Sequence, residues 1–221
     1  LSMVDVMVRK SFKEHYAGGE LDFGKNLLVV KVAGMFVTNF LQKEMEIIKK
    51  DKSELIILSL EDLYSHEINI TPENSDAGFP VKFKGKCDRI DSLNGKTRVI
   101  DYKSGMVMPS ELALKDWDLL LEGTKQDKIF QVLFYAYVFA KNQSDANKQV
   151  QAGIISFRNL SSGFMPVKTL GGVEIDDGVL TEFENVLQAL TGELLDKKVP
   201  FSQTPNPDHC VYCPFVGICN R

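Results

Sequence analysis

Apolar and polar positions alternate in some segments of the chain and recur with a helical period in others. Residues 79–85 alternate as a half-buried strand does, and residues 23–50 carry an apolar stripe at helical spacing. Together with shorter segments of both kinds, these patterns predict a single-domain α/β fold. The predicted helices span residues 4–16, 23–50, 125–141 and 176–197, and the predicted strands span residues 55–60, 66–70, 81–91, 98–103, 150–157 and 165–170.

A hairpin in the middle of the chain carries the most informative residues. The Asn-Gly pair at positions 94–95 is the preferred pair for a tight two-residue turn between antiparallel strands. On the second arm, Asp101 and Lys103 are two positions apart and point to one face, whereas Tyr102 points to the other. We expect a bulge or a slightly longer loop, which would let Asp88 on the first arm approach Asp101 closely.

Two carboxylates and a lysine at this hairpin suit a divalent metal and a phosphodiester. Mg2+ prefers oxygen ligands and is commonly held by one or two carboxylates together with water and substrate phosphate. Lys103 can position or deprotonate the attacking water, or stabilise the charged phosphate. The alternative is a surface hairpin with scattered charges, in which Arg89 and Asp91 pair in solvent.

The sequence Gly-x-x-Asp-Arg-Ile-Asp, followed by Ile-Asp-Tyr-Lys-Ser-Gly, resembles the PD-(D/E)XK nuclease superfamily, and within it the RecB/AddB-type exonuclease domain. The resemblance implies a restriction-endonuclease-like core, in which helices flank a central mixed β-sheet. It places the second motif of the family at Asp88 and the third at Asp101 and Lys103, with the two acids as ligands of Mg2+ or Mn2+. A Gln-x-x-x-Tyr motif of the same family matches Gln131 and Tyr135, beside the active site and DNA.

The helix that carries Gln131 and Tyr135 is otherwise apolar nearly all round, so it should be buried. Residues four apart share a helix face, and buried polar side chains need polar partners. We therefore expect these two residues to orient Lys103 and the scissile phosphate. In the alternative, Tyr135 is an ordinary core aromatic residue and Gln131 caps a backbone group.

Three of the four cysteines lie near the end of the chain, at Cys210, Cys213 and Cys219. Thiolates spaced Cys-x2-Cys-x5-Cys can converge on one metal centre. The pattern resembles the C-terminal part of the iron–sulfur staple of AddB-type nucleases, which implies a [4Fe–4S] cluster whose early fourth cysteine has no match here. Zinc bound by His209 and the three cysteines is one alternative, and unliganded cysteines in a disordered tail are another. Cys87 is expected in the core.

The expected organisation is a nuclease domain over residues 1–199 and a tail over residues 200–221 that packs on it. His15, the only early histidine, ends a helix before a glycine break and does not match the Gly-x-x-x-His first motif of the family. The chain is therefore expected to be the C-terminal part of a longer protein. Residues 106–123 are expected to form an irregular loop with a short helix, and a mobile lid beside Lys103. Glu61 is a candidate auxiliary ligand, or a solvated loop glutamate.

Composition narrows the functional classes. The chain has 221 residues, of which 44% are hydrophobic and 25% are charged, as is typical of a globular protein. Its apolar runs are shorter than a membrane span, no signal peptide is recognised, and the clustered cysteines favour a reducing compartment. A cytoplasmic location without a membrane partner is therefore expected. The formal net charge of -4 counts against tight non-specific binding of DNA by this chain alone.

These observations favour a metal-dependent deoxyribonuclease, of exonuclease type, that acts on DNA in repair or recombination. As the resemblance implies, it would be fused to or partnered with a helicase. Two other classes stay open: a catalytically inactive DNA-binding or structural module of such a complex, and a metal- or cluster-stapled scaffold with a vestigial site. The joint presence of Asp88, Asp101 and Lys103 favours activity.

Overall fold

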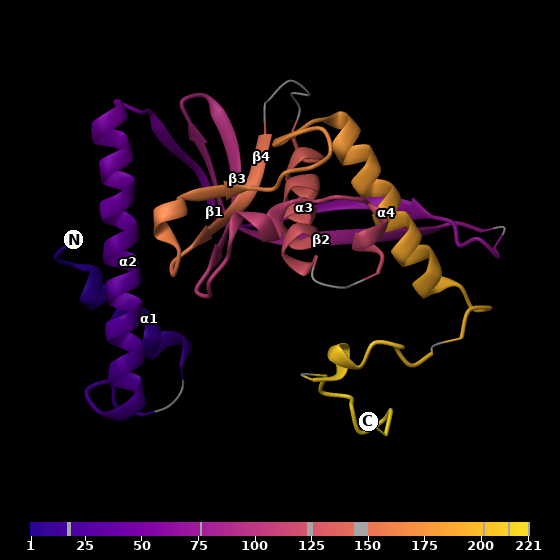
Figure 1. The fold of residues 1–221 in the computed structure, drawn as a ribbon, viewed down its shortest axis with the longest axis horizontal. Coiled ribbons are helices and arrows are strands. Elements are labelled where there is room, and N and C mark those ends of the chain that lie inside the picture. The colour runs from indigo at the N-terminus through magenta and orange to yellow at the C-terminus, as the bar shows by residue number, and fades with distance from the viewer. Residues whose placement is uncertain are drawn as a thin grey trace.

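A mixed sheet with helices on both faces organises the chain (Figure 1). The computed structural model describes residues 1–16, 19–75, 77–122, 126–143, 150–200, 202–211 and 213–220. The helices are α1 (Val4–His15), α2 (Gly24–Asp51), α3 (Asp127–Ala140) and α4 (Asp177–Leu195). The strands are β1 (Leu55–Ile70), β2 (Phe79–Leu93), β3 (Lys96–Lys103), β4 (Val150–Ser156), β5 (Phe164–Pro166) and β6 (Glu174–Ile175). The predicted α/β architecture is confirmed.

The sheet combines antiparallel and parallel neighbours. Within the described residues its order is β1-β2-β3-β4-β5, and β6 pairs with β4. Strands β3 and β4 are parallel, and the other pairs are antiparallel. A parallel pair needs a crossover connection, and here the connection contains α3. This crossover places α3 against the strands that carry the candidate site.

The two faces of the sheet are covered by different helices. The ring of Tyr102 meets that of Phe40 in α2 with centroids 5.4 Å apart, whereas the next residue, Lys103, bonds to Gln131 in α3. Because successive strand residues point to opposite faces, α2 and α3 lie on opposite sides of the sheet. Figure 1 shows the same arrangement, with α2 on one side and α3 and α4 on the other.

The predicted hairpin turn is confirmed. Asn94 has φ +52° and Gly95 has φ +82°, and a type I′ turn requires a positive φ at both central residues. Leu93 pairs with Lys96 directly beside the turn. The side chain of Asn94 also accepts a hydrogen bond from the backbone N–H of Glu54 at 2.8 Å, which ties the turn to the start of β1.

The strands predicted at residues 55–60 and 66–70 are one continuous strand, β1, so the predicted break is wrong. β1 lies at the edge of the sheet, where one side faces solvent and polar residues do not interrupt pairing. In place of the predicted break, β1 has two local irregularities. The pairing register shifts between Ile57 and Ser59, and Glu61 has a positive φ of 56°.

Other boundaries differ by a few residues. The helix predicted over residues 125–141 is α3, and Lys125 lies outside the described residues. Gly123, at the end of the irregular loop predicted over residues 106–123, also lies outside them. The rest of that loop contains two short 3-10 helices, as predicted. None of the helices in the described part of the chain has both the length and the apolar character that crossing a membrane requires.

Candidate active site

Asp88 and Asp101 face each other across β2 and β3. The antiparallel register runs without a shift from the turn to the Arg89–Ile100 pair, and one further step places Asp88 opposite Asp101. The expected bulge is wrong, because both acids lie six positions from the turn and approach without one. Regular pairing ends at this level, and the backbone N–H of Tyr102 donates instead to Asp88 Oδ2 at 2.8 Å.

The carboxyl group of Asp101 is buried and incompletely satisfied. Burial raises its pKa; the Lys103 ammonium opposes that shift, and the Asp88 carboxylate adds to it. Lys103 Nζ lies 2.9 Å from Asp101 Oδ2, but this oxygen has no aligned hydrogen bond. A buried carboxylate oxygen of this kind, beside a second carboxylate, is suited to a cation.

An amide on α3 holds Lys103 in place. Lys103 Nζ donates to Gln131 Oε1 at 2.6 Å, and Gln131 Nε2 donates to the hydroxyl of Tyr135 at 2.9 Å. Gln131 and Tyr135 lie one turn apart on the same helix face. The structure therefore brings together Asp88, Asp101, Lys103, Gln131 and Tyr135. The amide of Gln131 joins two side chains, as expected for polar groups on a mostly buried helix, and does not serve as a backbone cap.

Asp88 and Asp101 fit a Mg2+ or Mn2+ ion as a pair. Mg2+ keeps several waters and is usually bound by only one or two carboxylates. No group of three or more His, Cys, Asp and Glu side chains is arranged to hold a metal in the described part of the chain. The pair therefore suits an ion that takes its remaining ligands from water and phosphate.

Cys87 and Glu61 flank the site without joining it. Cys87 is fully buried, as predicted, and burial raises the pKa of its thiol to about 12. The thiol is therefore protonated at neutral pH and is a poor metal ligand. Glu61 is exposed and pairs with Lys86 at 2.6 Å. This contact matches the solvated alternative for Glu61, although the residue lies in β1 and not in a loop.

The tail does not bring its cysteines together as a metal site. Cys210, Cys213 and Cys219 are half-buried. Neither they nor His209 belong to a group of three possible ligands among the described residues. Positions 201, 212 and 221 of the tail lie outside those residues. The described part of the tail therefore shows no preformed site for a [4Fe–4S] cluster or a zinc ion.

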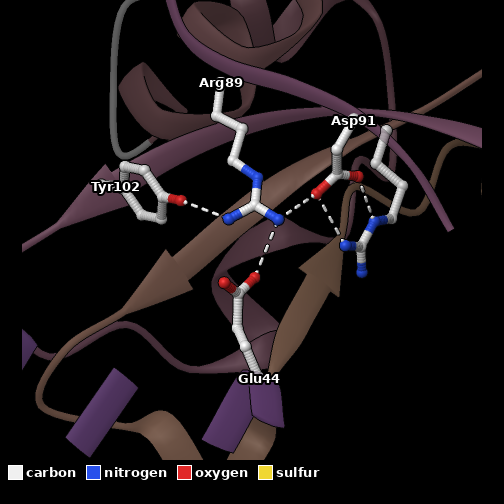
Figure 2. A network of polar contacts seen from close by, with 5 residues as sticks. Glu44, Arg89, Asp91 and Tyr102 are labelled. Atoms are coloured by element: carbon white, nitrogen blue, oxygen red, sulfur yellow. Dashed lines mark hydrogen bonds and ion pairs between the residues drawn. The ribbon is translucent and has the colours of Figure 1, made fainter. Parts of the chain in front are cut away.

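A buried charge network lies on the opposite face of the same strands (Figure 2). Arg89 NH2 is 2.6 Å from Asp91 Oδ2 and 2.8 Å from Glu44 Oε1, and Arg89 NH1 donates to the Tyr102 hydroxyl at 3.1 Å. Arg98 donates two further hydrogen bonds to Asp91, of 2.7 and 2.8 Å. The alternative in which Arg89 and Asp91 pair in solvent is wrong, because their side chains are 3% and 0% exposed.

The sequence contained one signal for this network. Asp91 and Arg98 are opposite each other in the hairpin register, so an acid and a base at these positions indicate a cross-strand pair. Nothing local indicated that the pair is buried, or that Glu44 of α2 completes it. Sequence reasoning therefore missed the contribution of α2 to this part of the sheet.

Comparison with protein families and with curated proteins adds one finding. Residues 9–220 match the family described as the PD-(D/E)XK nuclease superfamily. No curated protein matches the chain. The matched region includes β2, β3 and α3, which position the two carboxylates, the lysine and the Gln–Tyr pair. The chain therefore belongs to the PD-(D/E)XK nuclease superfamily.

Proposed function

We propose that this chain is a metal-dependent deoxyribonuclease of the RecB/AddB type that acts as an exonuclease. The observation that carries the proposal is the meeting of Asp88, Asp101 and Lys103 on two adjacent strands. Gln131 and Tyr135 support the lysine from α3. Membership of the superfamily supports phosphodiester hydrolysis. The subfamily and the exonuclease mode rest on the resemblance of the sequence motifs.

Asp88 and Asp101 are the proposed ligands of Mg2+ or Mn2+. A divalent cation at such a pair lowers the pKa of a bound water and offsets the charge that develops on the phosphate. The backbone N–H of Tyr102 orients Asp88, and Asp101 presents an oxygen without an aligned hydrogen bond. Because Asp101 is buried, its interaction with a cation is less screened than at an exposed site.

Lys103 is the proposed cation for the scissile phosphate or the attacking water. An ammonium group has three donors, so Lys103 can bind Asp101 and Gln131 and still donate one hydrogen bond. Gln131 Oε1 fixes the direction of the Lys103 side chain, and Tyr135 fixes the amide of Gln131. Gln131 and Tyr135 therefore act by positioning Lys103 toward the reacting phosphate.

The resemblance also supports proposals about the biological setting. DNA is the proposed substrate, in repair or recombination, with a helicase on the same chain or as a partner, in the cytoplasm. We propose a nuclease domain over residues 1–199, with the tail over residues 200–221 packed on it. The net charge of -4 predicts weak non-specific affinity for DNA, which favours a partner that delivers the substrate.

DNA cleavage with Mg2+ and with EDTA tests the proposed activity. We expect linear single- or double-stranded DNA to be degraded in Mg2+ and to remain intact in EDTA, because the metal activates water and offsets phosphate charge. A covalently closed circle should survive, because an exonuclease needs an end. Cleavage in EDTA would contradict metal dependence, and cutting of the circle would identify an endonuclease. DNA binding without any cleavage would identify an inactive binding module.

We further propose, from their spacing alone, that Cys210, Cys213 and Cys219 bind iron–sulfur when a fourth ligand is supplied. Zinc completed by His209 is the alternative. Anaerobically purified protein should then contain iron and show a broad absorption band in the blue, and both should be lost in Cys213→Ser. Bound zinc without the band would support the alternative. Protein that contains neither metal would contradict both assignments.

A further inference from the structure

The face of the sheet opposite to the candidate site holds a compact set of charges (Figure 2). It contains the guanidinium groups of Arg89 and Arg98, the carboxylates of Asp91 and Glu44, and the hydroxyl of Tyr102. The two positive and two negative charges balance. Such a set tolerates little displacement, because the loss of one partner leaves a buried charge unpaired.

Tyr102 connects this network to Asp88. Its hydroxyl accepts a hydrogen bond from Arg89 at 3.1 Å, and its backbone N–H donates to Asp88 Oδ2 at 2.8 Å. The ring of Tyr102 stacks on Phe157 with centroids 5.6 Å apart and meets Phe40 edge-on at 5.4 Å. Tyr102 therefore links the charge network, through its side chain, to the backbone N–H that holds Asp88.

Helix α2 reaches the network through two residues on one of its faces. Phe40 and Glu44 are one turn apart, so they share a face. Phe40 packs on the ring of Tyr102 in β3, and Glu44 pairs with Arg89 in β2 at 2.8 Å. Helix α2 therefore contacts both strands that carry the carboxylates, and it does so from the far side of the sheet. Its contact on β2 is Arg89, the residue that follows Asp88.

We infer that Glu44, Arg89 and Tyr102 are positioning residues that fix Asp88 relative to Asp101 from the far face of the sheet. The inference rests on the proposed function, in which both acids bind one ion. A small shift of β2 against β3 would change the distance of each ligand from that ion. Arg89 directly follows Asp88, and Tyr102 directly follows Asp101. Because successive strand residues point to opposite faces, each candidate ligand is one residue away from a member of the network on the far face.

Two conservative variants test this inference. Tyr102→Phe removes the hydroxyl and keeps the aromatic packing, and Glu44→Gln removes the charge and keeps the size. The matched controls are Tyr137→Phe and Glu184→Gln, because the buried Tyr137 hydroxyl donates to Glu184 at 2.8 Å in a network between α3 and α4. The control network resembles the test network, because each joins a tyrosine, a glutamate and a cation. Each of the four variants removes one hydroxyl or one charge from its network.

Two readouts separate positioning from a general loss of stability. The first is the Kd for Mn2+, measured by electron paramagnetic resonance without DNA. The second is the amide hydrogen exchange of Tyr102 relative to that of Val99 in the metal-free protein. Val99 lies in the core of the same strand, so the ratio cancels global unfolding and reports the hydrogen bond to Asp88.

Tyr102→Phe and Glu44→Gln should each raise the Kd for Mn2+ about tenfold and accelerate Tyr102 exchange relative to Val99. The two controls should change both quantities less than about twofold. Equal shifts in test and control variants, or no shift in the test variants, would overturn the inference. If Tyr102→Phe does not fold, Glu44→Gln decides the question. A wild-type chain that binds no Mn2+ would refute the proposed function, while the exchange ratio would still test the positioning of Asp88.

Discussion

Replacing Asp101 by Asn is expected to lower the rate of Mg2+-dependent DNA cleavage by about 1,000-fold or more, because the change replaces a charged metal ligand by a neutral amide. Lys103→Ala should lower the cleavage rate about 100- to 1,000-fold, which corresponds to a rise in the activation free energy on the order of 3–4 kcal/mol. The loss of other preorganised groups that stabilise transition-state charge has an effect of this size. The measurement is the single-turnover rate on linear DNA over a range of Mg2+ concentrations. More Mg2+ should not restore Lys103→Ala, because this side chain is not a ligand.

Lys128 and Glu111 provide a matched control for these changes. The side chains of Lys103 and Lys128 are both 28% exposed, and each pairs with a carboxylate, at 2.9 and 3.0 Å. Lys128→Ala and Glu111→Gln should therefore leave the rate within about threefold of wild type, since they break only a partly exposed ion pair. A wild-type rate for Asp101→Asn, or an equal loss for Lys128→Ala, would contradict the assigned roles.

Asp91→Ala should lower the free energy of unfolding by about 3–5 kcal/mol. The change leaves Arg89 and Arg98 in the interior with only Glu44 as a counter-charge. Because a domain is typically stable by about 5–15 kcal/mol, this loss is a large part of the total. The measurement is the urea midpoint at pH 7, with the slope of the transition checked for two-state behaviour.

An exposed ion pair on α2 provides the comparison for this variant. Glu46 pairs with Lys43 at 3.5 Å, and the Glu46 side chain is 68% exposed. Glu46→Ala should cost only about 0–1 kcal/mol, because water already screens and solvates this pair. If Asp91→Ala and Glu46→Ala shift the urea midpoint equally, the buried charges stabilise the fold no more than an exposed ion pair does.

The hairpin and the residues of the candidate site were predictable because their signals are local. An Asn-Gly turn at residues 94–95 fixes the register, and the register fixes which residues face each other. The Gln131–Tyr135 pair was also local, because a helix places residues four apart on one face. The expected bulge near Asp88 was wrong although the register already placed that acid opposite Asp101.

The contribution of α2 was not predictable from local patterns. Glu44 contacts Arg89 only because α2 crosses the face of the sheet where Arg89 points, and the packing of distant elements sets that orientation. The continuity of β1 through Glu61 was missed for a related reason. Polar residues interrupt an apolar pattern, but at a sheet edge they do not interrupt backbone pairing.

The most direct test of the proposed metal site is a crystal structure of this chain with Mn2+, in which the anomalous signal locates the ion. We expect one Mn2+ between β2 and β3, bound by carboxylate oxygens of Asp88 and Asp101, with Lys103 still bonded to Gln131. Mn2+ bound elsewhere, or no ion at these two carboxylates at a saturating concentration, would contradict it.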